Sequence, residues 1–89
     1  MNNSTARRFE IVIDGQVGFL NYAIAAGRMR LLHTEVPPAL QGRGLAGQLA
    51  QAALEYATRE HLRVVPLCPF VQAYLKRHPE YRSLIDDTR

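Results

Sequence analysis

The apolar residues of this chain change their spacing at residues 37–47, a stretch that reads PPALQGRGLAG. Upstream of it, apolar and polar residues alternate, which is typical of strands with one buried face. Downstream, apolar residues recur at the spacing of an amphipathic helix. The prolines end the first pattern and the glycines precede the second, so the fold must join a strand to a helix through a short glycine-bearing turn.

The alternating pattern predicts strands over residues 8–13, 16–25 and 28–36. Asp14-Gly15 and Ala26-Gly27 fall between these segments and are typical of tight hairpin turns. The strands are therefore expected to form an antiparallel meander. Residues 1–6 are polar and are expected to lie loosely outside it.

After the turn, the pattern predicts a helix over residues 45–61. The apolar run at residues 62–67 does not alternate with polar residues, which indicates a strand that is buried on both faces. Such burial is typical of a parallel strand that follows a helical crossover. Pro69 suits the first turn of a second helix over residues 69–78. The order β-β-β-α-β-α predicts an α+β fold, with a mixed sheet made of an antiparallel three-stranded meander and one parallel strand.

Length and composition narrow the functional classes. A chain of 89 residues is expected to form a single domain over residues 1–89, with an ordered core at about residues 8–82. One cysteine allows no internal disulfide, and the scattered histidines suggest no metal site, so a reducing, cytoplasmic setting is expected. No apolar run approaches the roughly 20 residues that span a membrane. The net charge of +3 is too small to indicate a nucleic-acid binder.

The glycine turn at the start of the first helix is suited to binding an anion. A helix N-terminus exposes backbone N–H groups without intrahelical partners and carries the positive end of the helix dipole. Glycines let the backbone curl around a phosphate, and Arg43 adds a full positive charge. The alternative is a plain loop whose glycines only allow close packing. The stretch is not a Walker loop, because no Gly-Lys-Ser/Thr follows it.

Residues 41–46, Gln-Gly-Arg-Gly-Leu-Ala, match the motif Gln/Arg-x-x-Gly-x-Gly/Ala, and the chain thereby resembles the GNAT superfamily of acetyl-CoA-dependent acyltransferases. The segments HTEVPPALQGRG and VVPLCPFVQAYLKRHPEY resemble its minimal subgroup of N-acetyltransferase domain-containing proteins. The resemblance covers roughly residues 8–82 and implies a GNAT-like core that binds acetyl-CoA, with the turn around the pyrophosphate and the end of the preceding strand along the pantetheine arm. The cofactor-binding residues that it implies are Val36, Pro37, Gln41, Gly42, Arg43, Gly44, Leu45, Ala46 and Gly47.

The chain also departs from the usual pattern of this superfamily. Longer members carry helices between their first strands that build much of the acceptor site, and the short turns here leave no room for them. The resulting open cleft suits a bulky acceptor such as a protein side chain or N-terminus. A second copy of the chain, as a homodimer, or another partner could equally complete the site.

Cys68 is the sharpest candidate for catalysis. It follows the buried strand and precedes Pro69, so it is expected at a helix N-terminus, where the dipole lowers the pKa of a thiol. Three roles are open to it. It is a nucleophile that forms an acetyl-cysteine, an acid that protonates the departing coenzyme A thiolate, or a small buried hydrophobe.

Glu35 and Tyr74 are the other catalytic candidates. Glu35 is either a general base or a solvated carboxylate at a strand end; it shares a strand face with His33, and a bulge near Val36 would redirect it. The resemblance makes Tyr74 a general acid, although His78 and the proline after it stand where Gly-Phe usually follows.

Two functions of different classes remain. The first is an acetyl-CoA-dependent N-acetyltransferase that acts on an amine, which could belong to a protein. The second is a coenzyme A-binding module with little or no catalysis, which the missing acceptor-site elements favour. A nucleic-acid-binding domain ranks below both, because no basic and aromatic residues interleave, and no membrane partner is expected.

Overall fold

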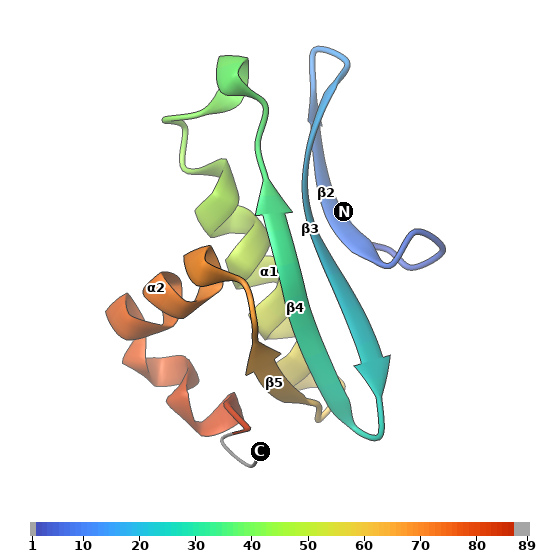
Figure 1. Ribbon diagram of the computed structural model, residues 1–89, viewed down its shortest axis with the longest axis vertical. Helices are drawn as coiled ribbons and strands as arrows, with labels where there is room; N and C mark the ends of the chain where they lie inside the picture. Colours follow the sequence, from blue (N-terminus) through green and yellow to red (C-terminus); the bar gives the residue numbers. More distant parts are fainter. Residues whose placement is uncertain (1, 87–89) are drawn as a thin grey trace.

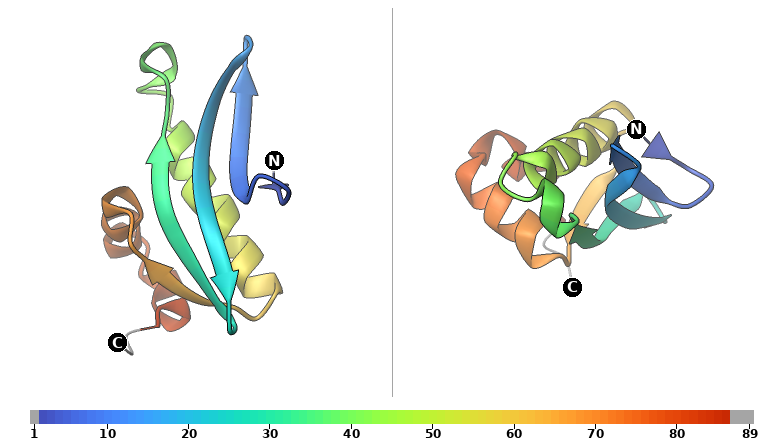
Figure 2. Two further views of the ribbon diagram at one scale, coloured as in Figure 1. Left: turned by 45° about the vertical axis from the view of Figure 1, so that its right-hand side comes forward. Right: turned by 90° about the horizontal axis from the view of Figure 1, so that it is seen from above.

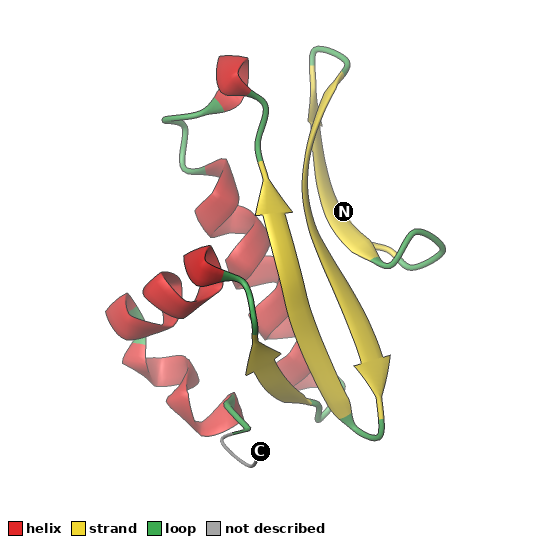
Figure 3. Cartoon of the chain, in the orientation of Figure 1, coloured by secondary structure: helices red, strands yellow, loops and turns green. Residues whose placement is uncertain are grey.

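The structure is a computed structural model that describes residues 2–86, so residues 1 and 87–89 of the expected domain lie outside the described part. Within this range the strands form one sheet in the order β1-β2-β3-β4-β5 (Figure 1). The strands are β1 (Asn2–Asn3), β2 (Arg8–Ile13), β3 (Gln16–Ala25), β4 (Arg28–Glu35) and β5 (Arg63–Pro66). The α-helices are α1 (Leu45–Arg59) and α2 (Pro69–Arg77), and short 3-10 helices span Pro38–Leu40 and Pro79–Leu84 (Figure 3).

The sheet confirms the predicted α+β fold with its mixed strand directions. Neighbouring strands from β1 to β4 pair antiparallel, and β5 pairs parallel to β4 after the crossover through α1. Both hairpin turns lie where the sequence predicts them, and Asp14 and Gly15 adopt φ values of 50° and 76°. Two consecutive residues with positive φ match the right-handed twist of the strands on either side, which is why Asp-Gly is favoured here.

The expectation that residues 1–6 lie loosely outside the sheet is wrong for its first described residues. Asn2 pairs with Phe9 and Asn3 with Arg8, which adds the short strand β1 at the edge of β2. The hydroxyl of Tyr22 donates a hydrogen bond of 2.8 Å to Asn2 Oδ1 and holds this strand. Side-chain hydrogen bonding thus orders a polar segment that carries no apolar pattern.

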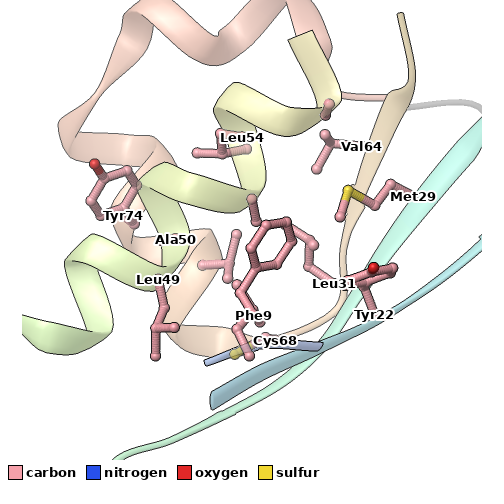
Figure 4. Packing of buried hydrophobic residues seen from close by; sticks show 14 of the residues in the cluster. Phe9, Tyr22, Met29, Leu31, Leu49, Ala50, Leu54, Val64, Cys68 and Tyr74 are labelled. Carbon is pink, nitrogen blue, oxygen red and sulfur yellow. The ribbon is translucent and has the colours of Figure 1, made fainter. Parts of the chain in front are cut away.

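Helix α1 lies across one face of the sheet, and its buried side is made of aliphatic and small residues. Leu49, Ala50 and Ala53 are fully buried, and Figure 4 shows Phe9 and Leu31 in the same layer. Burying one leucine stabilises the fold by about 1.5–3 kcal/mol, so this contact fixes α1 against β2–β4. Figure 2 shows no helix over the opposite face of these strands within residues 2–86.

The observed helix boundaries follow from the backbone at their ends. Helix α1 ends at Arg59 rather than at residue 61, because His61 adopts a left-handed φ of 56° that turns the chain toward β5. Helix α2 begins at Pro69, as predicted, and packs against α1 and the end of the sheet. Neither α-helix in the described range is long and apolar enough to cross a membrane.

Strand β4 contains a bulge at Leu32, earlier in the strand than the bulge expected near Val36. Asn21 pairs with His33 and the next residue of β3 pairs with Leu31, which leaves Leu32 as the additional residue. A bulge changes the face on which the following side chains lie. Beyond Leu32, the even-numbered residues of β4 therefore turn toward the helices.

The segment after α2 covers the outer edge of β5. Ile85 forms a parallel bridge to Val64, and the Asp86 N–H donates a hydrogen bond of 2.8 Å to Val64 O. The guanidinium of Arg63 donates to the backbone oxygens of Ser83 and Ile85. The residues after Tyr81 thus satisfy backbone groups that an exposed edge would leave unpaired.

Candidate functional site

The glycine turn adopts backbone conformations that other residues rarely adopt. Gly42 has a φ of 84° and Gly44 a φ of 72°, and α1 begins directly after Gly44. The left-handed region costs an L-residue roughly 1–2 kcal/mol, which explains glycine at both positions. The first-turn N–H groups of α1 lack intrahelical acceptors, so the turn places unpaired donors next to the exposed side chain of Arg43.

Gln41 holds the start of this turn against the end of β4. Its side-chain Nε2 donates a hydrogen bond of 3.0 Å to the backbone oxygen of Val36. Between the two residues, the 3-10 helix Pro38–Leu40 forms a tight bend, and Leu40 is buried. Val36 is expected to contact the cofactor, but its carbonyl oxygen already accepts this hydrogen bond within the protein. The Gln41 side chain stabilises the conformation of the loop.

A hollow of about 230 Å³ lies along the inner side of the turn. Its lining is mainly apolar, and it is smaller than the roughly 300–1,000 Å³ of a typical ligand pocket, so it could hold part of an elongated ligand. The lining residues are Val36, Leu40, Gln41, Gly42, Gly44, Leu45, Ala46, Gly47 and Phe70. Pro37 and Arg43, which the sequence also predicts, are not among them, whereas Leu40 and Phe70 were not predicted.

Strands β4 and β5 separate beside this hollow. Their parallel pairing ends at Leu31 and Pro66, and the N–H groups of Leu67 and Cys68 both donate to the backbone oxygen of Leu31, each at 3.0 Å. Beyond Leu31, β4 continues to Glu35 without β5 at its side. A gap therefore opens between the end of β4 and the start of α2.

Cys68 lies in this gap as the residue that precedes the first turn of α2, as predicted. It is only 3% exposed, and its Sγ is 3.3 Å from Thr34 Oγ1. Burial acts to raise the pKa of the thiol, but hydrogen bonds from Thr34 and from the backbone N–H groups of Val71, Phe70 and Thr34 together lower that pKa below its ordinary value of 9.0. The surroundings of the sulfur thus stabilise the thiolate.

Glu35 lies near this gap but on the other face of the sheet. Its side chain is 65% exposed, and its Oε1 is 3.5 Å from His33 Nε2, so the two residues share a face as the sequence predicts. Thr34, between them, turns toward Cys68 because of the bulge at Leu32. Glu35 is therefore open to a molecule that approaches the sheet from the side without helices.

Tyr74 lies away from Cys68. Its ring stacks on His78 with the ring centres 4.0 Å apart, and Figure 4 shows its oxygen directed away from Cys68. Burial, followed by the charges of Tyr81, Glu80 and Glu55, raises the pKa of its hydroxyl. The structure thus does not bring Tyr74 together with the other two predicted catalytic residues.

A second hollow, of about 520 Å³, lies beside β1 and the turn that follows it. Its walls include Asn3, Thr5 and Glu10, and the Glu10 carboxylate already accepts hydrogen bonds from Arg8 and Asn3. This hollow lies outside the glycine turn and the gap at Cys68. The glycine turn and the gap at Cys68 together form the candidate site.

The comparisons with known proteins agree on one family. The model of the GCN5-related N-acetyl-transferase family matches residues 8–84. Protein NATD1 of Mus musculus is 47% identical over 76 residues, which cover 82% of this chain and 69% of that protein. Protein NATD1 of Danio rerio is 34% identical over 84 residues, which cover 89% of this chain and 76% of that protein.

A solved structure shows the same fold. It is the solution NMR structure of a GCN5-like protein from Staphylococcus aureus, which is similar with a TM-score of 0.73 and 22% sequence identity. The match covers 93% of this chain and 84% of that chain. The family match over residues 8–84, the related sequences and the shared fold lead to one conclusion: the chain belongs to the GCN5-related N-acetyltransferase family.

Proposed function

We propose that the protein binds acetyl-CoA between the glycine turn and the gap at Cys68 and transfers the acetyl group to an amine. One observation carries this proposal. Val36 and Phe70 line the apolar hollow inside the turn, and each lies two residues from a member of the Thr34–Cys68 pair. The hollow therefore lies between the N–H donors of the turn and the residues that flank the Thr34–Cys68 pair.

The glycine turn would hold the pyrophosphate of coenzyme A. The N–H groups at the start of α1 and the positive end of its dipole favour a phosphate. Gly42 and Gly44 let the backbone curve around it with φ values that other residues resist. The exposed guanidinium of Arg43 can follow a charged ligand, and the apolar hollow suits the pantetheine arm.

Cys68 would act as the nucleophile rather than as the acid. A sulfur that accepts hydrogen bonds from backbone N–H groups and from Thr34 is stabilised as a thiolate, and a thiolate attacks while a thiol donates a proton. Acetyl-CoA supplies an activated acetyl thioester. The Cys68 sulfur forms a bond to the acetyl carbon as the bond to coenzyme A breaks, and the released thiolate takes a proton from water.

The acceptor amine would approach from the face of the sheet that carries Glu35. This face is open over β2–β4 (Figure 2), and the exposed carboxylate of Glu35 can take a proton from an ammonium group, directly or through water. The neutral amine then bonds to the acetyl carbon and gives up one more proton to water, and the bond from Cys68 to the acetyl carbon breaks, which restores the thiolate from which the cycle began. An open face suits an acceptor amine on a large molecule such as a protein.

Mass spectrometry of the protein after incubation with acetyl-CoA tests both halves of the proposal. A native spectrum should show an adduct with the mass of coenzyme A or acetyl-CoA, and Gly44→Glu should lose it. Gly27→Glu is the matched control: Gly27 has a φ of 76°, close to the 72° of Gly44, and both are open to an added Cβ, but Gly27 lies in the β3–β4 hairpin turn at the opposite end of the sheet (Figure 1). The same spectrum reports whether the chain is a dimer.

A denatured spectrum of the same sample separates enzyme from binding module. An acetyl-sized increment that survives denaturation and is absent in Cys68→Ala supports the nucleophile. An adduct without that increment rules out the acetyl-cysteine and leaves either direct transfer from acetyl-CoA to the amine or a coenzyme A-binding module with little or no catalysis, which a screen of acceptor amines separates. The absence of any adduct at micromolar protein would refute the binding site itself.

A further inference from the structure

We infer that Thr34 is a positioning residue for this chemistry, because its hydroxyl lies in hydrogen-bond contact with the Cys68 sulfur and donates to that sulfur when Cys68 is a thiolate. The catalytic role of Thr34 rests on the proposed function. The hydrogen bond and its effect on the pKa of Cys68, in contrast, are properties of the protein without ligand. The two atoms, Thr34 Oγ1 and Cys68 Sγ, lie 3.3 Å apart across the gap between β4 and α2.

The bulge in β4 explains how Thr34 reaches the sulfur. In a regular strand, residues 30, 32 and 34 would share one face, and Leu31 lies fully buried on the other. The additional residue at Leu32 moves Thr34 to the face of Leu31. The separation of β4 from β5 beyond Leu31 then leaves space for the hydroxyl beside Cys68. The bulge at Leu32 and the end of the β4–β5 pairing at Leu31 together bring the Thr34 hydroxyl next to Cys68.

Hydrogen bonds, rather than charged side chains, set the state of this sulfur. The pKa of Cys68 is governed by burial, then by the Thr34 hydroxyl, and then by backbone N–H groups of Val71, Phe70 and Thr34. On β4, the carboxylate of Glu35 faces solvent on the side of the sheet opposite Cys68. Among the described residues of α1, those buried in the core are apolar, and on α2 the Tyr74 oxygen points away (Figure 4).

The direction of the Thr34 hydrogen bond depends on the protonation of Cys68. A thiolate has no proton to give, so the hydroxyl must donate to it, whereas a thiol can donate to the hydroxyl oxygen. Backbone N–H groups remain in either case, because they belong to the start of α2 and to β4. The hydroxyl is therefore the part of this environment that a substitution can remove without altering the backbone.

The test is the titration of Cys68 in the protein without ligand. Because the chain contains one cysteine, its ¹³Cβ chemical shift reports the thiol and thiolate forms without ambiguity, and it can be followed against pH for a buried group. Thr34→Val removes the hydroxyl and keeps the branched shape, and should raise the pKa of Cys68 by about one unit. Thr34→Ser keeps the hydroxyl and should restore most of the difference. Thr34→Ala provides the same loss of hydroxyl if the valine variant does not fold.

Thr58→Val is the matched control. Its hydroxyl donates a hydrogen bond of 2.9 Å to the backbone oxygen of Leu54 in α1, so its loss removes the same group from a different element. The pKa of Cys68 in this variant should equal that in the unmodified protein. A folded Thr34→Val protein with an unchanged Cys68 pKa, or an equal shift in Thr58→Val, would overturn the inference.

A second measurement connects the hydrogen bond to the proposed function. The rate at which acetyl-CoA labels Cys68, measured against pH, should shift to higher pH in Thr34→Val by the amount that the titration gives, and Thr34→Ser should restore it. If the unmodified protein takes up no acetyl group, the proposed function fails while the titration still decides the role of Thr34. If labelling occurs with the same pH profile in Thr34→Val despite a shifted titration, Thr34 does not act in the transfer.

Discussion

Gly44 in the turn and Gly47 in α1 should respond in opposite directions to substitution by alanine. Gly44 has a φ of 72°, and a Cβ added there meets nothing within 4 Å, so the cost of Gly44→Ala is the left-handed backbone alone. That cost is roughly 1–2 kcal/mol, and the smaller conformational freedom of the unfolded alanine chain offsets about 0.4–1 kcal/mol of it. We therefore expect a loss of about 1 kcal/mol in the free energy of unfolding.

Gly47 lies inside α1, where glycine is the weaker helix former. A Cβ at this position would lie 3.7 Å from Tyr74 Cε2, which is an ordinary contact. Gly47→Ala should therefore stabilise the protein by about 0.5–1 kcal/mol. The two variants add the same methyl group at positions three residues apart, and the difference between them comes mainly from the backbone conformation at each position.

Urea denaturation measures both changes. With a slope of about 1 kcal/mol/M for a small protein, the midpoint of Gly44→Ala should fall by about 1 M urea, and its melting temperature by about 4–8 °C. The midpoint of Gly47→Ala should rise. Equal midpoints for the two variants would refute the reasoning, because they would mean that Gly44 is not held in the left-handed conformation. Coenzyme A binding should weaken in Gly44→Ala, since the curve of the turn changes with it.

Three further outcomes can be measured. Gln41→Leu should weaken coenzyme A binding and increase amide hydrogen exchange around residue 41, because it removes the hydrogen bond to Val36 O; unchanged exchange would contradict this role. Asp86→Asn should lower the free energy of unfolding by about 1 kcal/mol at low salt and by less at high salt, because the lost ion pair with Arg28 is partly exposed; a loss that salt does not alter would argue against the ion pair. The pKa of Cys68 is lowered in the folded state, so its contribution to stability is complete above pH 9.0 and is lost as the pH falls through the lowered pKa. The stability of the protein relative to Cys68→Ser should therefore rise as the pH approaches 9.0 from below, and a constant difference would contradict the lowered pKa.

The candidate site shows where sequence reasoning works and where it stops. The motif at residues 41–46 predicts the turn, because glycine adopts the positive φ values of Gly42 and Gly44 without the strain that other residues incur. Cys68 at the N-terminus of a helix also follows from local order, since proline is suited to the first helical position. The hydrogen-bond partner of Cys68 cannot be predicted from local order. Thr34 is distant in the sequence, and an alternating pattern assigns it to the wrong face.

Local rules therefore determined the elements of this protein and their order. Period-two and helical spacing, Asp-Gly turns and proline at a helix start are effects of neighbouring residues, and they suffice for the β-β-β-α-β-α fold and for the family motif. Tertiary structure alone decided the bulge at Leu32, the cover that residues 79–86 provide for β5, and the side of the sheet on which Glu35 lies. A bulge arises when strands with different partners on their two edges adjust their register. That adjustment depends on contacts between residues far apart in the chain, which no local pattern contains.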